Sequence, residues 1–247
     1  MSPAAITNVP AESDWLCEGC GYTLNGLPTG GNCPECGKPT RESAADLRTL
    51  PIWEQEDTGS APHRFVITSL AVIFRPNSFY RSFATRGRRE QSAQFASLHW
   101  AVASILFAVA AWVHMDWFLG MIRTLPMGPF VQWYVVIPLA VTTFLSLLLT
   151  TYVAARLTTW EATYRGYRLP VNVVLRGLDY HAAHYLPVAI VAAATVIGYR
   201  IALGHSPLLV TWGTTYLYTL CVEVVIAALY LFWTYWIAMR NTMYASR

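Results

Sequence analysis

The sequence predicts an all-α integral membrane bundle of four spans, preceded by an interfacial helical segment and by a small N-terminal β-type ribbon that carries cysteines. Three observations predict this architecture. Of the 247 residues, 55% are hydrophobic and only 13% are charged, whereas soluble domains carry about 25% charged residues. Four apolar runs are long enough to cross a bilayer. Four of the five cysteines lie within residues 17–36.

The first part of the chain divides into three predicted segments. Residues 1–14 are predicted to form a flexible leader, and residues 15–40 contain the clustered cysteines. Residues 41–62 are polar and acidic and lack hydrophobic periodicity, which predicts a flexible acidic linker. No apolar stretch of signal-peptide length occurs in residues 1–60. We therefore expect this part of the chain to stay in the cytosol with its thiols reduced.

Residues 63–97 are predicted to form an amphipathic segment in the membrane interface. The apolar stretch 65–74 is too short to cross a bilayer, and Pro76 stops or restarts any helix there. Aromatic and arginine side chains follow, a composition typical of interfacial helices: Phe79, Tyr80, Phe83, Arg81, Arg86, Arg88 and Arg89. A short helix packed against the bundle is the alternative, and the sequence leaves open whether 65–74 enters the bilayer.

Residues 98–247 predict a four-span membrane domain. The spans cover about 98–122, 130–157, 185–203 and 212–239, each with at least the roughly 18–20 apolar residues that a hydrocarbon core about 30 Å thick requires. Of the 17 Lys and Arg residues, all but Arg123 and Arg200 precede the first span, separate the second from the third, or follow the fourth. The positive-inside rule then predicts that both termini are cytoplasmic.

One structural zinc ion is predicted at four cysteines: Cys17, Cys20, Cys33 and Cys36. They form two Cys-x-x-Cys pairs, CEGCGY and CPECGK, with twelve residues between them. Each pair points two thiolates at one metal, and the glycine that follows permits a left-handed backbone. Four thiolates meet the tetrahedral demand of a closed zinc site and leave no position for a reacting water. We therefore expect zinc to fold the ribbon without catalysing a reaction.

Alternative readings of the cysteines are weaker. A redox Cys-x-x-Cys motif needs a surrounding βαβ fold, for which the segment has no room, and disulfides would suit a secreted protein. Nucleic acid binding needs a basic footprint, but the ribbon contains only Glu18, Glu35 and Lys38 as charged residues. We expect the residues Tyr22, Leu24 and Leu27 to form the apolar cluster beside the metal.

Two family resemblances follow from these residues. The string CEGCGYTLNGLPTGGNCPECGKPT, about a tenth of the chain, resembles the N-terminal zinc ribbon of many bacterial membrane proteins, which implies a bacterial inner membrane. Phe74-Arg75-Pro76, followed by Phe79-Tyr80 before the spans, resembles the Yip-domain family of multi-span proteins. That resemblance implies a non-enzymatic protein of trafficking or membrane organisation, with no catalytic residues to carry over.

Ionisable residues inside the predicted spans are candidates for function, because lipid disfavours them. Glu223 lies about midway along the fourth span, and His114 and Asp116 lie in the outer part of the first. Arg200 lies near the outer end of the third span, at a depth that suits pairing with Asp116. These groups either fix helix packing or form a proton or ion pathway through Glu223 and His114.

A further polar string precedes the third span, with the pattern D-x-H-x-x-H: Asp179, His181 and His184. The two histidines share a helical face, so the string could belong to a second metal site. Such a site needs one or two more ligands, and none is evident nearby. An interfacial cluster beside Tyr180 and Tyr185 is the favoured interpretation.

The sequence therefore favours a non-catalytic multi-span membrane protein whose cytoplasmic zinc ribbon is a structural or protein-contact module. No nucleophile elbow, phosphate loop or dinucleotide fingerprint is present. The expected partners are the lipid bilayer, anionic lipids at the inner leaflet and a cytosolic protein, with nucleic acid excluded. The oligomeric state stays open, a homo-oligomer included. The alternative function is a small transporter or channel centred on Glu223.

Overall fold

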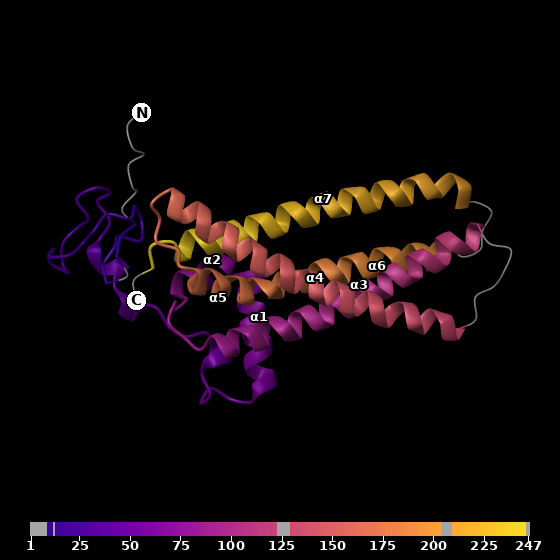
Figure 1. Ribbon diagram of the computed structural model, residues 1–247, viewed down its shortest axis with the longest axis horizontal. Helices are drawn as coiled ribbons and strands as arrows, with labels where there is room; N and C mark the ends of the chain where they lie inside the picture. Colours follow the sequence, from indigo (N-terminus) through magenta and orange to yellow (C-terminus); the bar gives the residue numbers. More distant parts are fainter. Residues whose placement is uncertain (1–8, 12, 123–128, 204–208, 246–247) are drawn as a thin grey trace. The chain divides into compact units, whose positions relative to one another are not determined.

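The structure, a computed structural model, describes residues 9–11, 13–122, 129–203 and 209–245. Most of the predicted leader, residues 1–8 and 12, lies outside them. Within the described residues the chain is helical (Figure 1), and its β-pairing is limited to three isolated bridges. Two of the bridges lie in the cysteine segment, Leu16 with Thr23 and Asn32 with Pro39. The predicted β-type ribbon therefore has paired residues but no described strand.

Seven α-helices follow the cysteine segment in the described chain: α1 Ala61–Phe74, α2 Pro76–Ser82, α3 Arg89–Ile122, α4 Pro129–Tyr164, α5 Val171–His181, α6 Tyr185–Leu203 and α7 Leu209–Thr242. The 3-10 turns are η1 Thr40–Ser43, η2 Ala45–Leu47, η3 Ile52–Glu54 and η4 Ala182–His184. The chain forms two compact units. Unit 1 contains residues 1–96, 151–181 and 234–247, and unit 2 contains residues 97–150 and 182–233.

Within the described parts of the chain, four helical stretches are long and apolar enough to cross a membrane: Arg89–Asp116, Tyr134–Tyr164, Val171–Ala202 and Gly213–Thr242. The first starts nine residues before the predicted span, because α3 begins at Arg89 and takes up the end of the segment predicted to be interfacial. Periodicity could not locate this start, since the first residues of α3 are polar. α1 is apolar but has only 14 residues.

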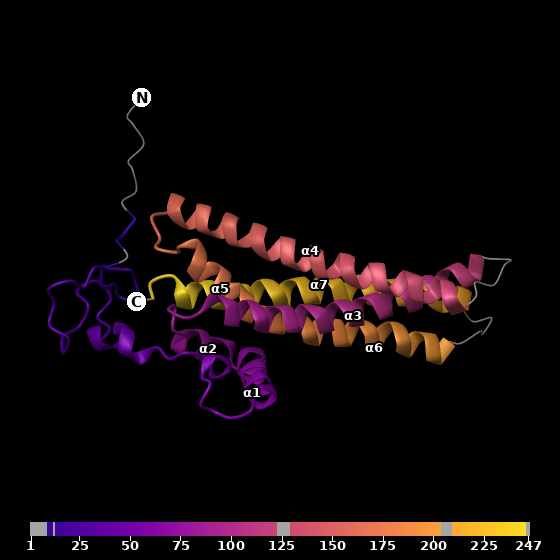
Figure 2. The ribbon, with the colours of Figure 1, turned by 60° about the horizontal axis from the view of Figure 1, so that its bottom comes forward.

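Unit 2 consists of parts of α3, α4, α6 and α7, which run alongside one another in two views (Figures 1 and 2). α3 packs on α6 with Ala110, Ala193 and Val196 buried together, and Leu220 of α7 packs against this cluster. Small residues let helix backbones approach closely. The outward side chains are large and apolar, including Ile137, Leu145, Leu149, Val222, Val224, Val225 and Leu229, all exposed. An exposed apolar surface of this extent is typical of a region that contacts a membrane or another protein.

Unit 1 is organised around buried aromatic rings. Trp53, Phe65 and Phe95 lie with ring centroids 5.3–6.1 Å apart, which joins η3, α1 and the first turns of α3. Tyr180 of α5 packs on Phe95 at 5.0 Å. The predicted interfacial segment thus contributes aromatic side chains to a protein core.

A buried ion pair lies beside these rings. The Arg176 guanidinium of α5 donates to both carboxylate oxygens of Glu54, at 2.8 and 3.0 Å, and the two side chains are 3% and 1% exposed. The hydroxyl of Tyr180 donates to the same carboxylate, and Arg176 lies over the ring of Phe83. Breaking such a pair on one side leaves an uncompensated buried charge, at about 3–5 kcal/mol.

The structure differs from the sequence-based expectation over residues 41–62. Three 3-10 turns occupy this stretch, and Ser43, Arg48 and Glu54 are buried. Its polar residues form hydrogen bonds and ion pairs with residues far away in the sequence. A search for local periodicity does not detect such pairs. Residues 43–54 of the segment expected to be a flexible linker therefore pack in unit 1, whereas residues 56–62 are exposed.

Candidate metal centre

The first Cys-x-x-Cys pair lies in a tight turn closed by two backbone hydrogen bonds. The amide of Gly21 donates to the carbonyl of Cys17 at 2.8 Å, and the amide of Cys17 donates to the carbonyl of Tyr22 at 2.8 Å. Gly21 has φ +80°, a left-handed conformation that glycine adopts without the clash that a Cβ would cause. We call residues 17–22 the first knuckle.

The second pair repeats the turn sixteen residues later. Gly37 donates to the carbonyl of Cys33 at 2.9 Å, Cys33 donates to the carbonyl of Lys38 at 2.7 Å, and Gly37 has φ +71°. An isolated antiparallel bridge flanks each turn at corresponding positions. Residues 33–38, the second knuckle, are therefore a structural copy of the first.

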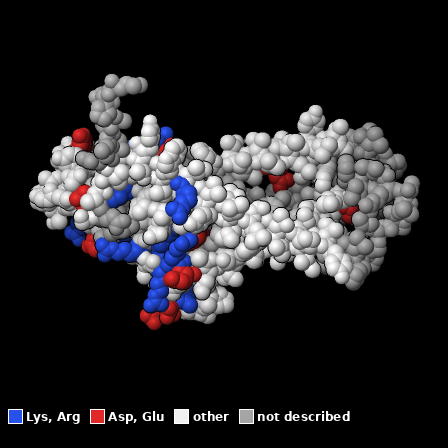
Figure 3. Space-filling view, viewed as in Figure 1, with Lys and Arg blue, Asp and Glu red and all other residues white. Residues whose placement is uncertain are grey.

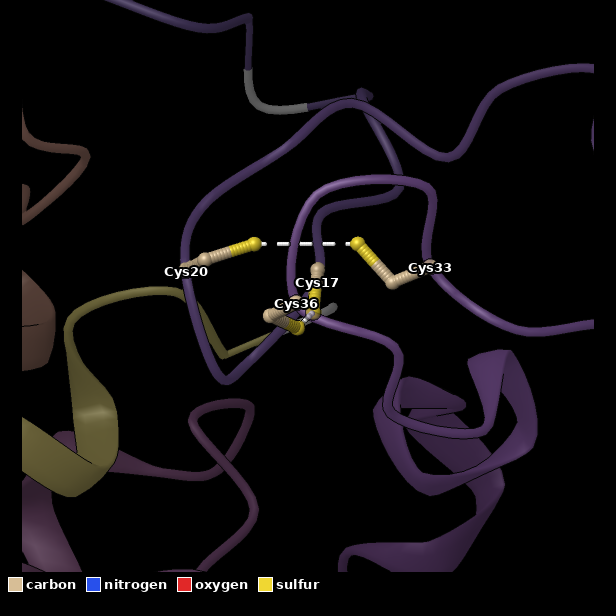
Figure 4. Close-up of side chains that lie close together, drawn as sticks. All are labelled: Cys17, Cys20, Cys33 and Cys36. Carbon is tan, nitrogen blue, oxygen red and sulfur yellow. Dashed lines mark hydrogen bonds between the residues drawn. The ribbon is translucent and has the colours of Figure 1, made fainter.

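The four sulfur atoms of the two knuckles form one compact group. The Sγ atoms of Cys17 and Cys36 are 3.5 Å apart, those of Cys20 and Cys33 are 3.7 Å apart, and all four lie within 4.8 Å of one another. Figure 4 shows the side chains of Cys20 and Cys33 pointing toward each other across the group. A tetrahedral zinc ion with Zn–S bonds of about 2.3 Å needs sulfurs about 3.8 Å apart.

These distances fit a metal ion and do not fit disulfides. All four thiols are free, and a disulfide would need sulfurs about 2.05 Å apart. Metal ions in proteins are held by His, Cys, Asp and Glu side chains. In the described part of the chain, these four cysteines are the group of such side chains that lies close enough together to hold one. The sequence-predicted ligands therefore converge on one point, and they could hold one cation.

The thiols differ in how readily they ionise. Desolvation and the neighbouring thiols raise the pKa of Cys20 to about 12, and desolvation also raises the pKa of Cys17. Desolvation acts the same way on Cys33, but the backbone N–H groups of Cys36 and Glu35 outweigh it and lower its pKa to about 7. Four thiolates this close repel one another, so a bound cation is what stabilises them together.

A small apolar core supports the sulfurs. Leu24 is fully buried with Cys17 and Cys33, and Trp15 and Leu27 pack against them. The sequence-based assignment of Tyr22 to this cluster was wrong, because its side chain is 40% exposed. The place goes to Trp15, whose indole N–H donates to the carbonyl of Ser43 at 2.9 Å.

The first knuckle is tied to the rest of unit 1 through Arg48. Its Nε donates to Glu18 Oε1 at 2.7 Å, while its side chain is only 3% exposed. Its other nitrogens donate to the carbonyls of Phe83 at 2.9 Å and Asn241 at 2.8 Å. These carbonyls lie at the C-terminal ends of α2 and α7, where helices leave acceptors unpaired and favour a cation. One arginine thus links the knuckle to two helix ends.

The C-terminal residues provide a second attachment. A Cβ placed on Gly21 would lie 2.7 Å from ring atoms of Tyr244, so the knuckle backbone packs directly on that ring. Arg168 donates to the carbonyls of Ala11 and Asp14 at 2.7 and 2.6 Å and to that of Ala245 at 3.3 Å. The chain before the ribbon and the chain after α7 are therefore held by the same guanidinium.

The second knuckle has a different environment. Residues 34–39 are all exposed, and a Cβ placed on Gly37 would meet nothing within 4 Å. Sequence reasoning found the metal ligands but missed Arg48, Arg168 and Tyr244. The partners of Arg48, for example, lie 30 to 193 residues away in the sequence, and no local pattern signals such pairs.

The intramembrane candidates fall into separate interactions within unit 2. Arg200 donates to Asp116 at 3.3 Å, the pairing that their predicted depths suit. His114 Nδ1 lies 2.6 Å from the hydroxyl of Tyr216. Neither carboxylate oxygen of Glu223 is exposed, and neither has a hydrogen-bond partner among the described residues. The structure therefore does not join His114 directly to Glu223.

The D-x-H-x-x-H string also divides. Asp179 accepts from Ser92 Oγ at 2.7 Å, and His181 Nε2 lies 2.9 Å from Thr234 Oγ1. His184 Nδ1 lies 2.7 Å from the hydroxyl of Tyr230. Each side chain thus has its own polar partner, and all three residues are buried. The structure does not bring them together as ligands of one metal ion.

A comparison of the chain with protein-family models, with curated proteins and with solved structures finds no match in any of the three. The fold and the site therefore define the class of this protein. It is a helical protein with four helices long and apolar enough to cross a membrane, and it carries a four-cysteine cluster able to hold a metal ion.

Proposed function

We propose that the protein is a four-span integral membrane protein whose cysteine cluster binds one structural zinc ion and forms a cytosolic protein-contact module. The observation that carries this proposal is the pair of knuckles with one backbone geometry and four sulfurs within 4.8 Å. Four thiolates complete the coordination of zinc and leave no position for a substrate or water. The role is therefore structural, and the protein is not an enzyme at this site.

The exposure of the second knuckle supports a protein-contact role. The first knuckle contacts Arg48 and Tyr244, while Pro34, Glu35 and Lys38 of the second are exposed on a turn that a bound metal would hold rigid. A rigid exposed turn binds a partner without a large ordering cost. Its charges are one acid and one base, so a protein surface suits it better than nucleic acid, which needs a basic footprint.

The membrane part of the proposal rests on the apolar helices and on the distribution of charge. Figure 3 shows basic side chains gathered over one part of the surface and a large remainder without them. Exposed arginines of unit 1 include Arg75, Arg81, Arg86 and Arg88, and the positive-inside rule assigns such residues to the cytoplasm. Both termini would then be cytoplasmic, with anionic lipids of the inner leaflet near these arginines.

The proposed location is a bacterial inner membrane, and the proposed role is in membrane organisation or trafficking. Two resemblances support these finer points: the ribbon to that of bacterial membrane proteins, and the segment from Phe74 to Tyr80 to the Yip-domain family.

The test starts from the full chain purified in detergent. We expect one zinc per chain by elemental analysis in the wild type and less than a tenth of that in Cys17→Ser, with Cys221→Ser as the matched cysteine control. Affinity purification from membranes should then recover a cytosolic protein with the wild type and Cys221→Ser but not with Cys17→Ser. Full zinc content in Cys17→Ser would disprove the metal site. Identical partners in all three samples would disprove the contact role.

A further inference from the structure

A row of polar side chains runs along one side of α7 within unit 2: Tyr216, Thr219, Glu223 and Tyr230. At 3.6 residues per turn these positions fall within a sector of about 60° and span about 21 Å of helix rise. Of residues 220–229 only Glu223 and Cys221 carry a polar group. The row is therefore narrow and long, inside a stretch of otherwise apolar sequence.

Each hydroxyl of the row has a protonatable or hydroxyl partner on another element of unit 2. Tyr216 contacts His114 of α3 at 2.6 Å, and its ring also lies 5.1 Å from that of Tyr199 of α6. The hydroxyl of Tyr199 lies 3.0 Å from Thr219 Oγ1. At the other end, Tyr230 contacts His184 of η4 at 2.7 Å. Imidazole and hydroxyl groups both accept and donate protons, so each pair is able to pass one on.

Glu223 lies between the two ends of this row. Its oxygens are shielded from the surface and have no hydrogen-bond partner among the residues described. An ionised carboxylate in that state is unfavourable, because nothing replaces the water that it has lost. The group is therefore suited to take up a proton and to release it when a path to water opens.

Among the described residues of unit 2, no unpaired lysine or arginine is available to Glu223. The described arginine of this unit, Arg200 of α6, is paired with Asp116. The other titratable groups of the packed elements are His114 and the buried His99 of α3, Tyr134 of α4, Tyr185 and Tyr199 of α6, and His184 of η4. The α4 residues 134–150 contain no acid, base or histidine.

We propose that Glu223 is a proton-binding site and that the α7 row conducts protons through unit 2. A proton from water on one side passes through the His114–Tyr216 pair, bonds to a carboxylate oxygen of Glu223, and leaves through the Tyr230–His184 pair to water on the other side. No electrons are transferred, and the carboxylate is regenerated in each cycle. This function is separate from the zinc site and goes beyond the proposed contact role.

The spacing along α7 sets what the path requires. Thr219 lies about 6 Å of rise from Glu223, and Tyr230 lies about 10 Å on the other side. The long Tyr and Glu side chains shorten these gaps, and water molecules must close the rest. Unit 2 contains two acids, Asp116 and Glu223, and the first of them is paired with Arg200.

The test reconstitutes the full-length protein in liposomes that contain a pH-sensitive dye, with a potassium gradient and valinomycin to drive proton entry. We expect the wild type to exceed protein-free liposomes at least tenfold and Glu223→Gln to fall to their level. Tyr230→Phe, which removes one hydroxyl, should lower the rate several-fold. Cys221→Ser, on the opposite, exposed side of α7, should match the wild type.

A second measurement needs no variant. Dicyclohexylcarbodiimide reacts with protonated carboxyl groups in apolar surroundings, and we expect it to label the wild-type peptide containing Glu223 and to stop proton entry. Wild-type rates equal to those of protein-free liposomes, or equal rates in Glu223→Gln and the wild type, would overturn the proposal. Zinc content measured on the same samples separates this outcome from failure of the zinc site.

Discussion

The first and second knuckles have the same backbone hydrogen bonds and the same left-handed glycine, yet their neighbours differ. Glu18 and Gly21 of the first contact Arg48 and Tyr244, whereas residues 34–39 of the second are exposed. The difference shows that the turn geometry does not depend on the anchoring contacts, since both Cys-x-x-Cys-Gly turns adopt it. Which of the two turns is anchored is decided by side chains outside the ribbon.

The largest expected effect comes from loss of the shared metal ion, which should unfold the two knuckles alike. Cys17→Ser and Cys33→Ser each delete one ligand of a shared ion, so we expect both to lose the metal and to unfold both turns together. Zinc supplies about 10–16 kcal/mol of apparent free energy in comparable peptides. Hydrogen exchange of residues 15–40 should rise equally in the two variants and stay unchanged in Cys221→Ser. Selective exchange in only the mutated knuckle would contradict a shared ion.

The next effect acts on the first knuckle alone. Arg48→Ala leaves the Glu18 carboxylate and the carbonyls of Phe83 and Asn241 without their donor. Because Glu18 is 23% exposed, we expect a loss near the low end for a broken buried pair, about 3 kcal/mol. Thermal unfolding of zinc-loaded protein measures it, and amide exchange should rise at 17–22 while zinc stays bound.

The exposed cation of the second knuckle is the matched control for Arg48. Lys38→Ala should change the free energy of unfolding by less than about 0.5 kcal/mol, as exposed substitutions do. A comparable loss in Lys38→Ala would show that charge, and not the anchoring contacts, stabilises the ribbon.

A matched pair of glycine substitutions sharpens the comparison. Gly21→Ala and Gly37→Ala both force a side chain into a left-handed backbone, at about 1–2 kcal/mol. Only Gly21→Ala also places its Cβ 2.7 Å from the ring of Tyr244, whereas the space beside Gly37 is open. We expect Gly21→Ala to destabilise the zinc-loaded protein more.

Adding Tyr244→Ala to each glycine variant identifies the cause. In the double variant with Gly21→Ala, the excess cost over Gly37→Ala should disappear, because the clash is removed. Equal costs for the two single variants, by the same thermal unfolding measurement, would show that the first knuckle does not pack on Tyr244.

The smallest expected effect compares two acids. Glu18→Gln keeps a hydrogen-bond acceptor for Arg48 but removes the charge, so we expect a loss of about 1 kcal/mol. Glu35→Gln, on the exposed second knuckle, should leave the free energy of unfolding unchanged within error. Raising the salt concentration should reduce the first effect only slightly, since Arg48 is buried.

Sequence reasoning worked where the cause is local. The spacing of Cys17, Cys20, Cys33 and Cys36 places four thiolates around one point, since each short turn has few conformations. It failed where the partners are distant, as at residues 41–62, whose polar composition predicts a flexible linker. Glu54 in that segment is buried against Arg176 of α5, 122 residues away, and no pattern within the segment reveals that partner.

The cysteine site that the sequence predicts is present as a four-sulfur cluster, and the four apolar runs are present as long helices. The local order of residues determines these two features. The geometry of a Cys-x-x-Cys turn and the length of an apolar helix both depend on residues that are neighbours in the sequence. The tertiary structure decided three other features: the anchoring of one knuckle by Arg48, the buried Glu54–Arg176 pair, and the polar partners of the α7 row. These depend on which distant surfaces pack together, a choice made by the free energy of the whole fold.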